Sequence, residues 1–143
     1  MKKPMIAVID GKGGGLGKAA VESLVEAGLD VEIVALGTNA IATANMLRGG
    51  AKDGASGENP ICHMAEKADV IVGPIAILMP DAIMGEVTER MAVSIAKSSA
   101  EKVLLPLQRC GIHVVGMGEI TIKELMQHLP AMVKQALEEK KNA

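Results

Sequence analysis

Five glycines lie within the seven residues from Gly11 to Gly17, between two apolar segments of different periodicity. The run before them, residues 4–10, has the continuous apolar character of a buried strand, and the run after them, residues 16–27, has helical spacing. Because glycine has no Cβ, such a loop lets backbone N–H groups and a helix N-terminus approach an anion closely. The chain is therefore expected to begin as an α/β unit with a candidate anion site.

The spacing of the glycines indicates which anion the loop suits. Gly11, Gly15 and Gly17 follow G-x-x-x-G-x-G, the spacing of the dinucleotide loop in short-chain dehydrogenases. The commoner pattern G-x-G-x-x-G fails, because Leu16 stands where its third glycine would be. We expect a nucleotide phosphate, with NADP or NAD as the first candidates. The predicted cofactor-binding residues of this glycine loop (residues 11–17) are Gly11, Lys12, Gly13, Gly14, Gly15, Leu16 and Gly17.

Two other interpretations of the glycine loop stay open. A P-loop for ATP nearly fits, since the stretch from Gly13 to Lys18 resembles G-x-x-x-x-G-K. That stretch is one residue short, and Ala19 lacks the hydroxyl that would hold Mg²⁺. In the third interpretation the glycines only shape a turn, within an oligomerising structural or regulatory module.

Composition limits the class of protein. A chain of 143 residues with 49% hydrophobic residues is expected to be a single domain, residues 1–143, with a substantial core. No apolar run is long enough for a transmembrane helix, and Lys2-Lys3 does not begin a signal peptide, so we expect a cytoplasmic protein without a membrane partner. A net charge of −2 and the lack of Phe, Tyr and Trp argue against a nucleic-acid partner. The ten methionines are expected to fill the core.

The rest of the chain continues to alternate strands and helices. Strands are expected at residues 31–36, 69–73, 102–107 and 113–116, and helices at residues 40–48, 60–67, 88–97 and from 121 onward. Residues 51–58 are small and polar and are expected to form a loop, whereas residues 74–84 fit either a strand or a buried helix. Short connections between alternating strands and helices require parallel strands. The predicted fold is a three-layer, Rossmann-like, doubly wound parallel sheet of about five strands.

Three loops are expected to meet at the carboxyl ends of these strands, where doubly wound sheets bind ligands. They are the glycine loop, the segment Gly37, Thr38 and Asn39, and the pair Gly73 and Pro74. An acidic residue usually follows the second strand of a NAD site and binds the ribose, but here Gly37 follows it. Gly37 leaves space for a 2′-phosphate that Thr38 or Asn39 could bind; equally, these two residues could only cap a helix.

The remaining polar residues do not define a reaction. The sequence has no tyrosine for the Tyr-x-x-x-Lys pair of short-chain dehydrogenases, so the catalytic residues stay unknown. Asp10 is expected to tie the glycine loop by accepting backbone N–H groups. No metal site is expected, because Cys62 and Cys110 with their neighbouring histidines lack two well-formed ligand pairs and fit buried structural cysteines better.

One bacterial family resembles the chain over most of its length. The resemblance rests on the runs AVIDGKGGGLGK (7–18), ALGTNAIATANML (35–47), GENPI (57–61), VGPIAIL (72–78), GEVTERMA (85–92) and LPLQRCGIHVVG (105–116). The family is a domain of unknown function, the one numbered 3842. The resemblance implies a small stand-alone cytoplasmic protein and brings no activity, substrate or catalytic residue.

Self-association is a further expectation. A chain this apolar, without aromatic residues and with a short last strand, is expected to bury more surface as a homodimer. Exposure of the apolar segment 74–80 would support such an interface.

Overall fold

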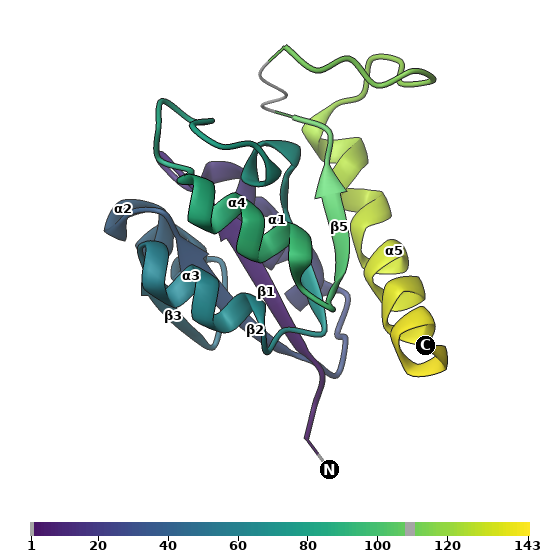
Figure 1. Ribbon diagram of the computed structural model, residues 1–143. Coiled ribbons are helices and arrows are strands. Elements are labelled where there is room, and N and C mark those ends of the chain that lie inside the picture. Colours follow the sequence, from purple (N-terminus) through teal and green to yellow (C-terminus); the bar gives the residue numbers. More distant parts are fainter. Residues whose placement is uncertain (1, 108–110) are drawn as a thin grey trace.

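The computed structural model describes residues 2–107 and 111–143, which form a parallel sheet between two layers of helices (Figure 1). The five strands have the order β3-β2-β1-β4-β5, so β1 is central. The elements are β1 (Met5–Asp10), α1 (Gly15–Glu26), β2 (Glu32–Gly37), α2 (Ala40–Arg48), β3 (Asp53–Ser56), α3 (Glu58–Ala65), β4 (Val70–Pro74), η1 (Ile75–Leu78), α4 (Glu89–Lys97), β5 (Glu101–Leu105) and α5 (Ile122–Asn142). All four pairings of neighbouring strands are parallel.

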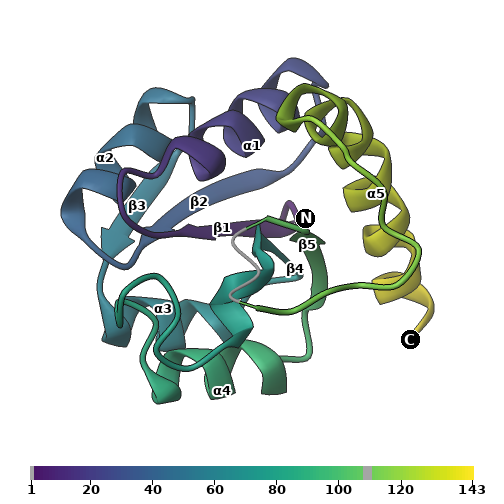
Figure 2. The ribbon, with the colours of Figure 1, turned by 90° about the horizontal axis from the view of Figure 1, so that it is seen from above.

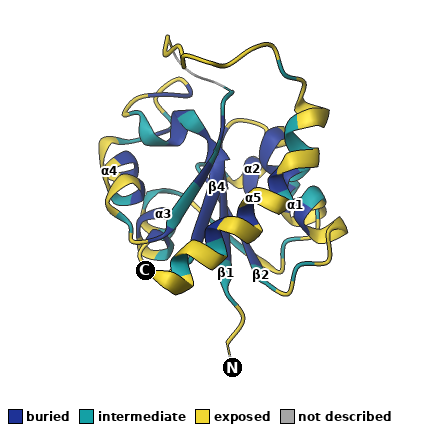
Figure 3. Ribbon diagram, turned by 90° about the vertical axis from the view of Figure 1, so that its right-hand side faces the viewer, coloured by how far each residue is buried: buried dark blue, intermediate teal, exposed yellow. Residues whose placement is uncertain are grey.

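The alternation of side chains in β1 explains the three layers. Ile6 and Val8 join the core under α1, α2 and α5, whereas Ala7 and Ile9 join the core under α3 and α4. Figure 2 shows these two groups of helices on opposite faces of the sheet. Because β1 is buried on both faces (Figure 3), its sequence is apolar from Met5 to Ile9, up to Asp10 at its carboxyl end. The predicted Rossmann-like, doubly wound parallel architecture is confirmed.

Local capping signals set several helix ends as predicted. The side-chain oxygens of Asn39, Thr88 and Thr121 each accept a hydrogen bond from a backbone N–H three residues later, at 2.9, 3.1 and 3.1 Å. Gly28 follows the end of α1 with a φ of 67°, the left-handed conformation that glycine adopts without strain. No helix in the described part of the chain is long and apolar enough to cross a membrane.

Three local predictions were wrong. Residues 53–56, expected in a loop, form the edge strand β3, which pairs only with β2 among the described strands and therefore needs little apolar sequence. Residues 113–116, expected to be a strand, are exposed and belong to no strand. The helix expected at residues 60–67 begins two residues earlier, as α3 at Glu58 with Gly57 as its N-cap, so Pro60 lies in the first turn but not at its first position.

The ambiguous segment after β4 is mostly buried. Pro74 ends β4, and η1 is a single 3₁₀ turn that buries Ala76 and Ile77. Residues 74–80 are therefore not exposed over most of their length, and this segment gives no support to a self-association interface. Exposed apolar side chains lie instead between Ile112 and Met117, where Val115 is fully exposed.

Candidate functional site at the glycine loop

The glycine loop lies at the carboxyl end of the central strand, at the point where the order of the sheet reverses. From β1 the chain continues to β2 and β3 on one side, and then crosses to β4 and β5 on the other side. The loop ends at α1, whose first turn carries no acidic residue. In open α/β sheets this position, with the positive end of a helix beside it, is where ligands bind.

Asp10 holds the two ends of the glycine loop together. Its Oδ1 accepts the N–H of Gly11 at 2.8 Å, and its Oδ2 accepts the N–H of Gly17 at 2.7 Å. Burial raises the pKa of the Asp10 carboxyl, although the same two hydrogen bonds act to lower it and the nearby charge of Glu86 raises it further. The predicted tying role of Asp10 is confirmed.

Close packing explains three of the loop glycines. A Cβ on Gly14 would lie 2.6 Å from the carbonyl oxygen of Ala42, and Gly14 also has a φ of 71°. A Cβ on Gly17 would lie 2.5 Å from the Sδ of Met46, and one on Gly11 would meet the hydroxyl of Thr38 at 2.8 Å. These glycines let α2 and the segment after β2 approach the loop.

Gly13 and Gly15 stand in a different environment. A Cβ on either residue would meet nothing within 4 Å, and neither residue has a left-handed φ. No backbone or side-chain acceptor within the described residues bonds the N–H groups of Gly13, Gly15 and Leu16. The carbonyls of Lys12 and Gly13 are held by the side chains of Asn39, at 2.9 Å, and Asn45. Two carbonyls of the glycine loop are thus bound by side chains of α2 and of its N-cap residue. Three N–H groups of the loop have no partner among the described residues.

Glu86 closes the side of the glycine loop that faces β2. Its Oε1 accepts the N–H of Lys12 at 2.9 Å, the hydroxyl of Thr38 at 2.5 Å and the Nδ2 of Asn39 at 2.9 Å. Burial raises the pKa of this carboxyl, but the three hydrogen bonds and the charge of Lys12 outweigh that effect and leave the pKa below its ordinary value. Glu86 is therefore an anion that joins the segments after β1, β2 and β4.

This arrangement corrects the expected role of the segment after β2. A Cβ on Gly37 would clash with the hydroxyl of Thr43, so the packing of α2 is by itself a sufficient reason for glycine at this position. The hydroxyl of Thr38 and the amide of Asn39 are already engaged by Glu86. Asn39 also caps α2, as the alternative interpretation predicted.

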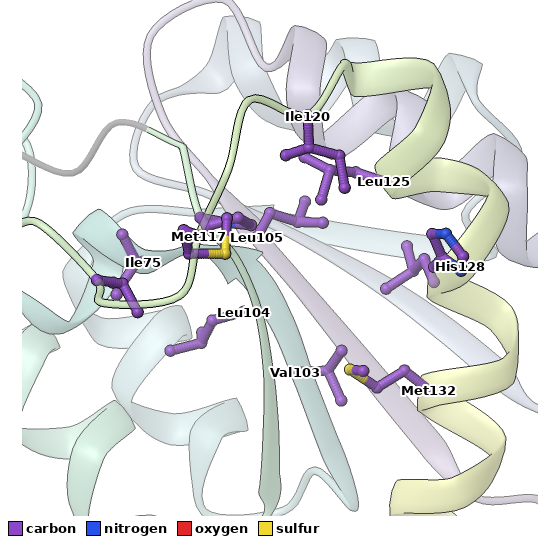
Figure 4. Close-up of a pocket in the computed structure, with 12 residues that line it drawn as sticks. Ile75, Val103, Leu104, Leu105, Met117, Ile120, Leu125, His128 and Met132 are labelled. Carbon is purple, nitrogen blue, oxygen red and sulfur yellow. The ribbon is translucent and has the colours of Figure 1, made fainter.

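A cavity of about 430 Å³ lies beside the glycine loop, and Glu86 is not among its lining residues. Asp10, residues 11–16, Leu107 and Ile122 line it. A second cavity of about 420 Å³ lies between β5 and α5 (Figure 4), and its lining includes Pro106. His128 is the one ionisable side chain among its described lining residues. The carboxyl end of the sheet thus offers an apolar space next to the open donors of the loop.

Other predicted candidates lie elsewhere. Gly73 and Pro74 are buried in β4, paired with β5, and do not line the cavity at the loop. Cys62 is buried, as expected, and its thiol donates to the carbonyl of Arg90 at 3.7 Å. Cys110 lies outside the described residues. The described residues contain no cluster of three or more potential metal ligands.

Comparison with known proteins identifies the family of the chain. It belongs to the family described as Domain of unknown function (DUF3842), whose model matches residues 5–138. A solved structure, a universal stress protein in complex with cAMP, is similar with a TM-score of 0.43 and 17% sequence identity, over 73% of this chain and 98% of that chain. No curated protein sequence matches the chain.

Proposed function

We propose that the chain binds a nucleotide, with a phosphate group held by the open backbone N–H groups of the glycine loop. A dinucleotide, NAD or NADP, is the first candidate ligand, and ATP is the alternative. The proposal is for a binding protein that acts as a sensor, a carrier or an enzyme subunit.

The observation that carries this proposal concerns Gly13 and Gly15, where neither packing nor backbone conformation explains a glycine. Gly11, Gly14 and Gly17 are explained by close packing, but Gly13 and Gly15 face open space with ordinary backbone conformations. Glycine is less favourable than alanine for the stability of a folded chain by roughly 0.5–1 kcal/mol when no conformational need exists. A ligand that approaches the backbone closely supplies the missing reason.

Positive groups next to the open N–H groups favour an anionic ligand, and the two carboxylates at the loop, Asp10 and Glu86, are each occupied by loop N–H groups. Lys12 and Lys18 flank the open N–H groups, and α1 begins without a carboxylate that would neutralise its positive end. The adjacent cavity, with Leu107 and Ile122 on its wall, offers apolar surface for the part of the ligand beyond the phosphate.

A thermal-shift titration of wild type and Gly15→Val with NAD, NADP and ATP tests the proposal. We expect a nucleotide to stabilise the wild type, and Gly15→Val to lose this response while still unfolding cooperatively, because two methyl groups would occupy the ligand's position. Gly118→Val is the matched control, since Gly118 also faces open space with an ordinary φ but lies outside the loop. If none of the three nucleotides shifts the wild type, the glycines only shape a turn. A shift by ATP with Mg²⁺ alone would favour the P-loop interpretation.

We also infer that the chain forms a homodimer. The segment 112–117 exposes Ile112, Val114, Val115 and Met117, and such a cluster of apolar side chains favours contact with another surface. Light scattering at high concentration should give twice the chain mass of 14.8 kDa, and a mass near 14.8 kDa would contradict this inference.

A further inference from the structure

Glu86 reaches the end of β2 from a distant part of the chain. It follows β4 by twelve residues, yet its carboxylate accepts hydrogen bonds from Thr38 and Asn39, the two residues directly after β2. The same oxygen also accepts the N–H of Lys12 in the glycine loop. The carboxylate therefore lies where the glycine loop and the end of β2 meet.

The backbone that delivers Glu86 is sterically unfavourable. Asp81, Ile83 and Met84 have φ values of 66°, 56° and 53°, in the left-handed region that side chains other than glycine rarely adopt. The segment is held in this shape by backbone hydrogen bonds, among them Glu86 N–H to the Ile83 carbonyl at 3.0 Å, and by burial of Ile83. Strained backbone that the surrounding structure enforces is typical of functional sites.

We propose that Glu86 binds the ribose hydroxyls of the nucleotide and thereby selects a ribose with a free 2′-hydroxyl over one with a 2′-phosphate. This inference rests on the proposed nucleotide-binding function of the glycine loop and deepens it. The ligand class is narrowed to nucleotides such as NAD, and NADP is disfavoured.

The chemistry of the ribose supports this role. In dinucleotide-binding sheets a carboxylate at the end of the second strand accepts the ribose hydroxyls, and this chain has Gly37 at that position. Glu86 supplies a carboxylate beside the next residue, Thr38. Its Oε1 is occupied by three donors, whereas Oε2 has no hydrogen-bond partner among the described residues and can accept the ribose.

A 2′-phosphate would meet unfavourable surroundings at the same place. It would bring negative charge next to the Glu86 carboxylate, and like charges that face each other are strongly disfavoured. The hydroxyl of Thr38 and the amide of Asn39, which would have to hold such a phosphate, already donate to Glu86. Lys12 is the nearby cation, and its charge acts on Glu86 itself.

Calorimetric titration of wild type, Glu86→Gln and Glu66→Gln with NAD and with NADP tests the inference. We expect the wild type to bind NAD at least about tenfold more tightly than NADP. Glu86→Gln retains an oxygen acceptor but removes the charge, so its ratio of the two affinities should fall toward one. Glu66→Gln makes the same change of charge at an exposed residue directly after α3, at the other end of the sheet, and should keep the wild-type ratio.

The possible failures are distinguishable. Equal affinities of the wild type for NAD and NADP would overturn the role of Glu86 while nucleotide binding stands, and so would an unchanged ratio in Glu86→Gln. If the wild type binds neither nucleotide nor ATP, the proposed function fails and this inference fails with it. Because the wild-type ratio alone can refute the proposal, the test holds even if Glu86→Gln does not fold.

Discussion

Gly14 and Gly15 are adjacent in the glycine loop, yet substitution by alanine should have opposite effects on stability. Gly14 has a φ of 71°, and its added Cβ would lie 2.6 Å from the carbonyl oxygen and 2.7 Å from the Cα of Ala42. Both atoms belong to the backbone of α2 and cannot rotate away. Gly15 has an ordinary φ, and its added Cβ would meet nothing within 4 Å.

The expected magnitudes follow from these two environments. The left-handed conformation costs a residue with a Cβ about 1–2 kcal/mol. Overpacking against α2 adds about 1–3 kcal/mol. The free energy of unfolding of Gly14→Ala should therefore fall by roughly 2–5 kcal/mol. Gly15→Ala should leave it unchanged or raise it by up to about 1 kcal/mol, because alanine restricts the unfolded chain more than glycine does.

Urea unfolding followed by circular dichroism at 222 nm measures both changes, and it does not need the aromatic residues that this chain lacks. The melting temperature of Gly14→Ala should lie roughly 8–20 °C below that of the wild type, at about 4 °C per kcal/mol. In buffer without urea, the folded Gly15→Ala protein should bind NAD more weakly than the wild type does. Equal stability of Gly14→Ala and wild type would refute the packing argument, and a large loss in Gly15→Ala would show that its glycine serves the fold.

Further predictions concern Asp10, Glu86 and the exposed segment before α5. Asp10→Asn should lower the free energy of unfolding by about 1–3 kcal/mol, because one of the two buried N–H groups of Gly11 and Gly17 would face an amide donor; a stability at or above wild type in urea would contradict this. The pKa of Glu86 is lowered in the folded protein, so its stabilising effect is present above its ordinary value of 4.5 and is lost as the pH falls through the folded value. The difference in melting temperature between wild type and Glu86→Gln should therefore shrink below pH 4.5, and a constant difference would be inconsistent with a stabilising role of the Glu86 carboxylate. Val115→Asp should shift a dimer to monomer in light scattering without lowering the melting temperature of the chain, since Val115 is fully exposed; a dimer that persists would place the interface elsewhere.

Much of the fold follows from local sequence signals. The apolar run of β1 and the glycines after it predict a strand, a tight loop and a helix, because each signal acts within a few residues. Thr88 and Thr121 begin helices for the same reason. The tying role of Asp10 was also predictable, since a short polar side chain directly before a loop can accept hydrogen bonds from the nearest free backbone N–H groups.

The errors come from features that depend on distant residues. The segment 53–56 forms a strand because β2 offers a free edge, although its own residues are small and polar. The apolar segment 113–116 has strand-like residues but no partner strand. The role of Glu86 could not be predicted from the sequence, because its contacts lie 47, 48 and 74 residues away and its loop adopts φ values that Ile83 and Met84 rarely take.

Equilibrium dialysis of the protein against NAD, read by absorbance at 260 nm, tests nucleotide binding at the glycine loop most directly. The chain has no Trp, Tyr or Phe, so absorbance at this wavelength reports the nucleotide with little contribution from the protein. The account predicts an excess of NAD on the protein side that approaches one molecule per chain for the wild type and disappears in Gly15→Val. Equal absorbance on both sides of the membrane for NAD, NADP and ATP alike would contradict it.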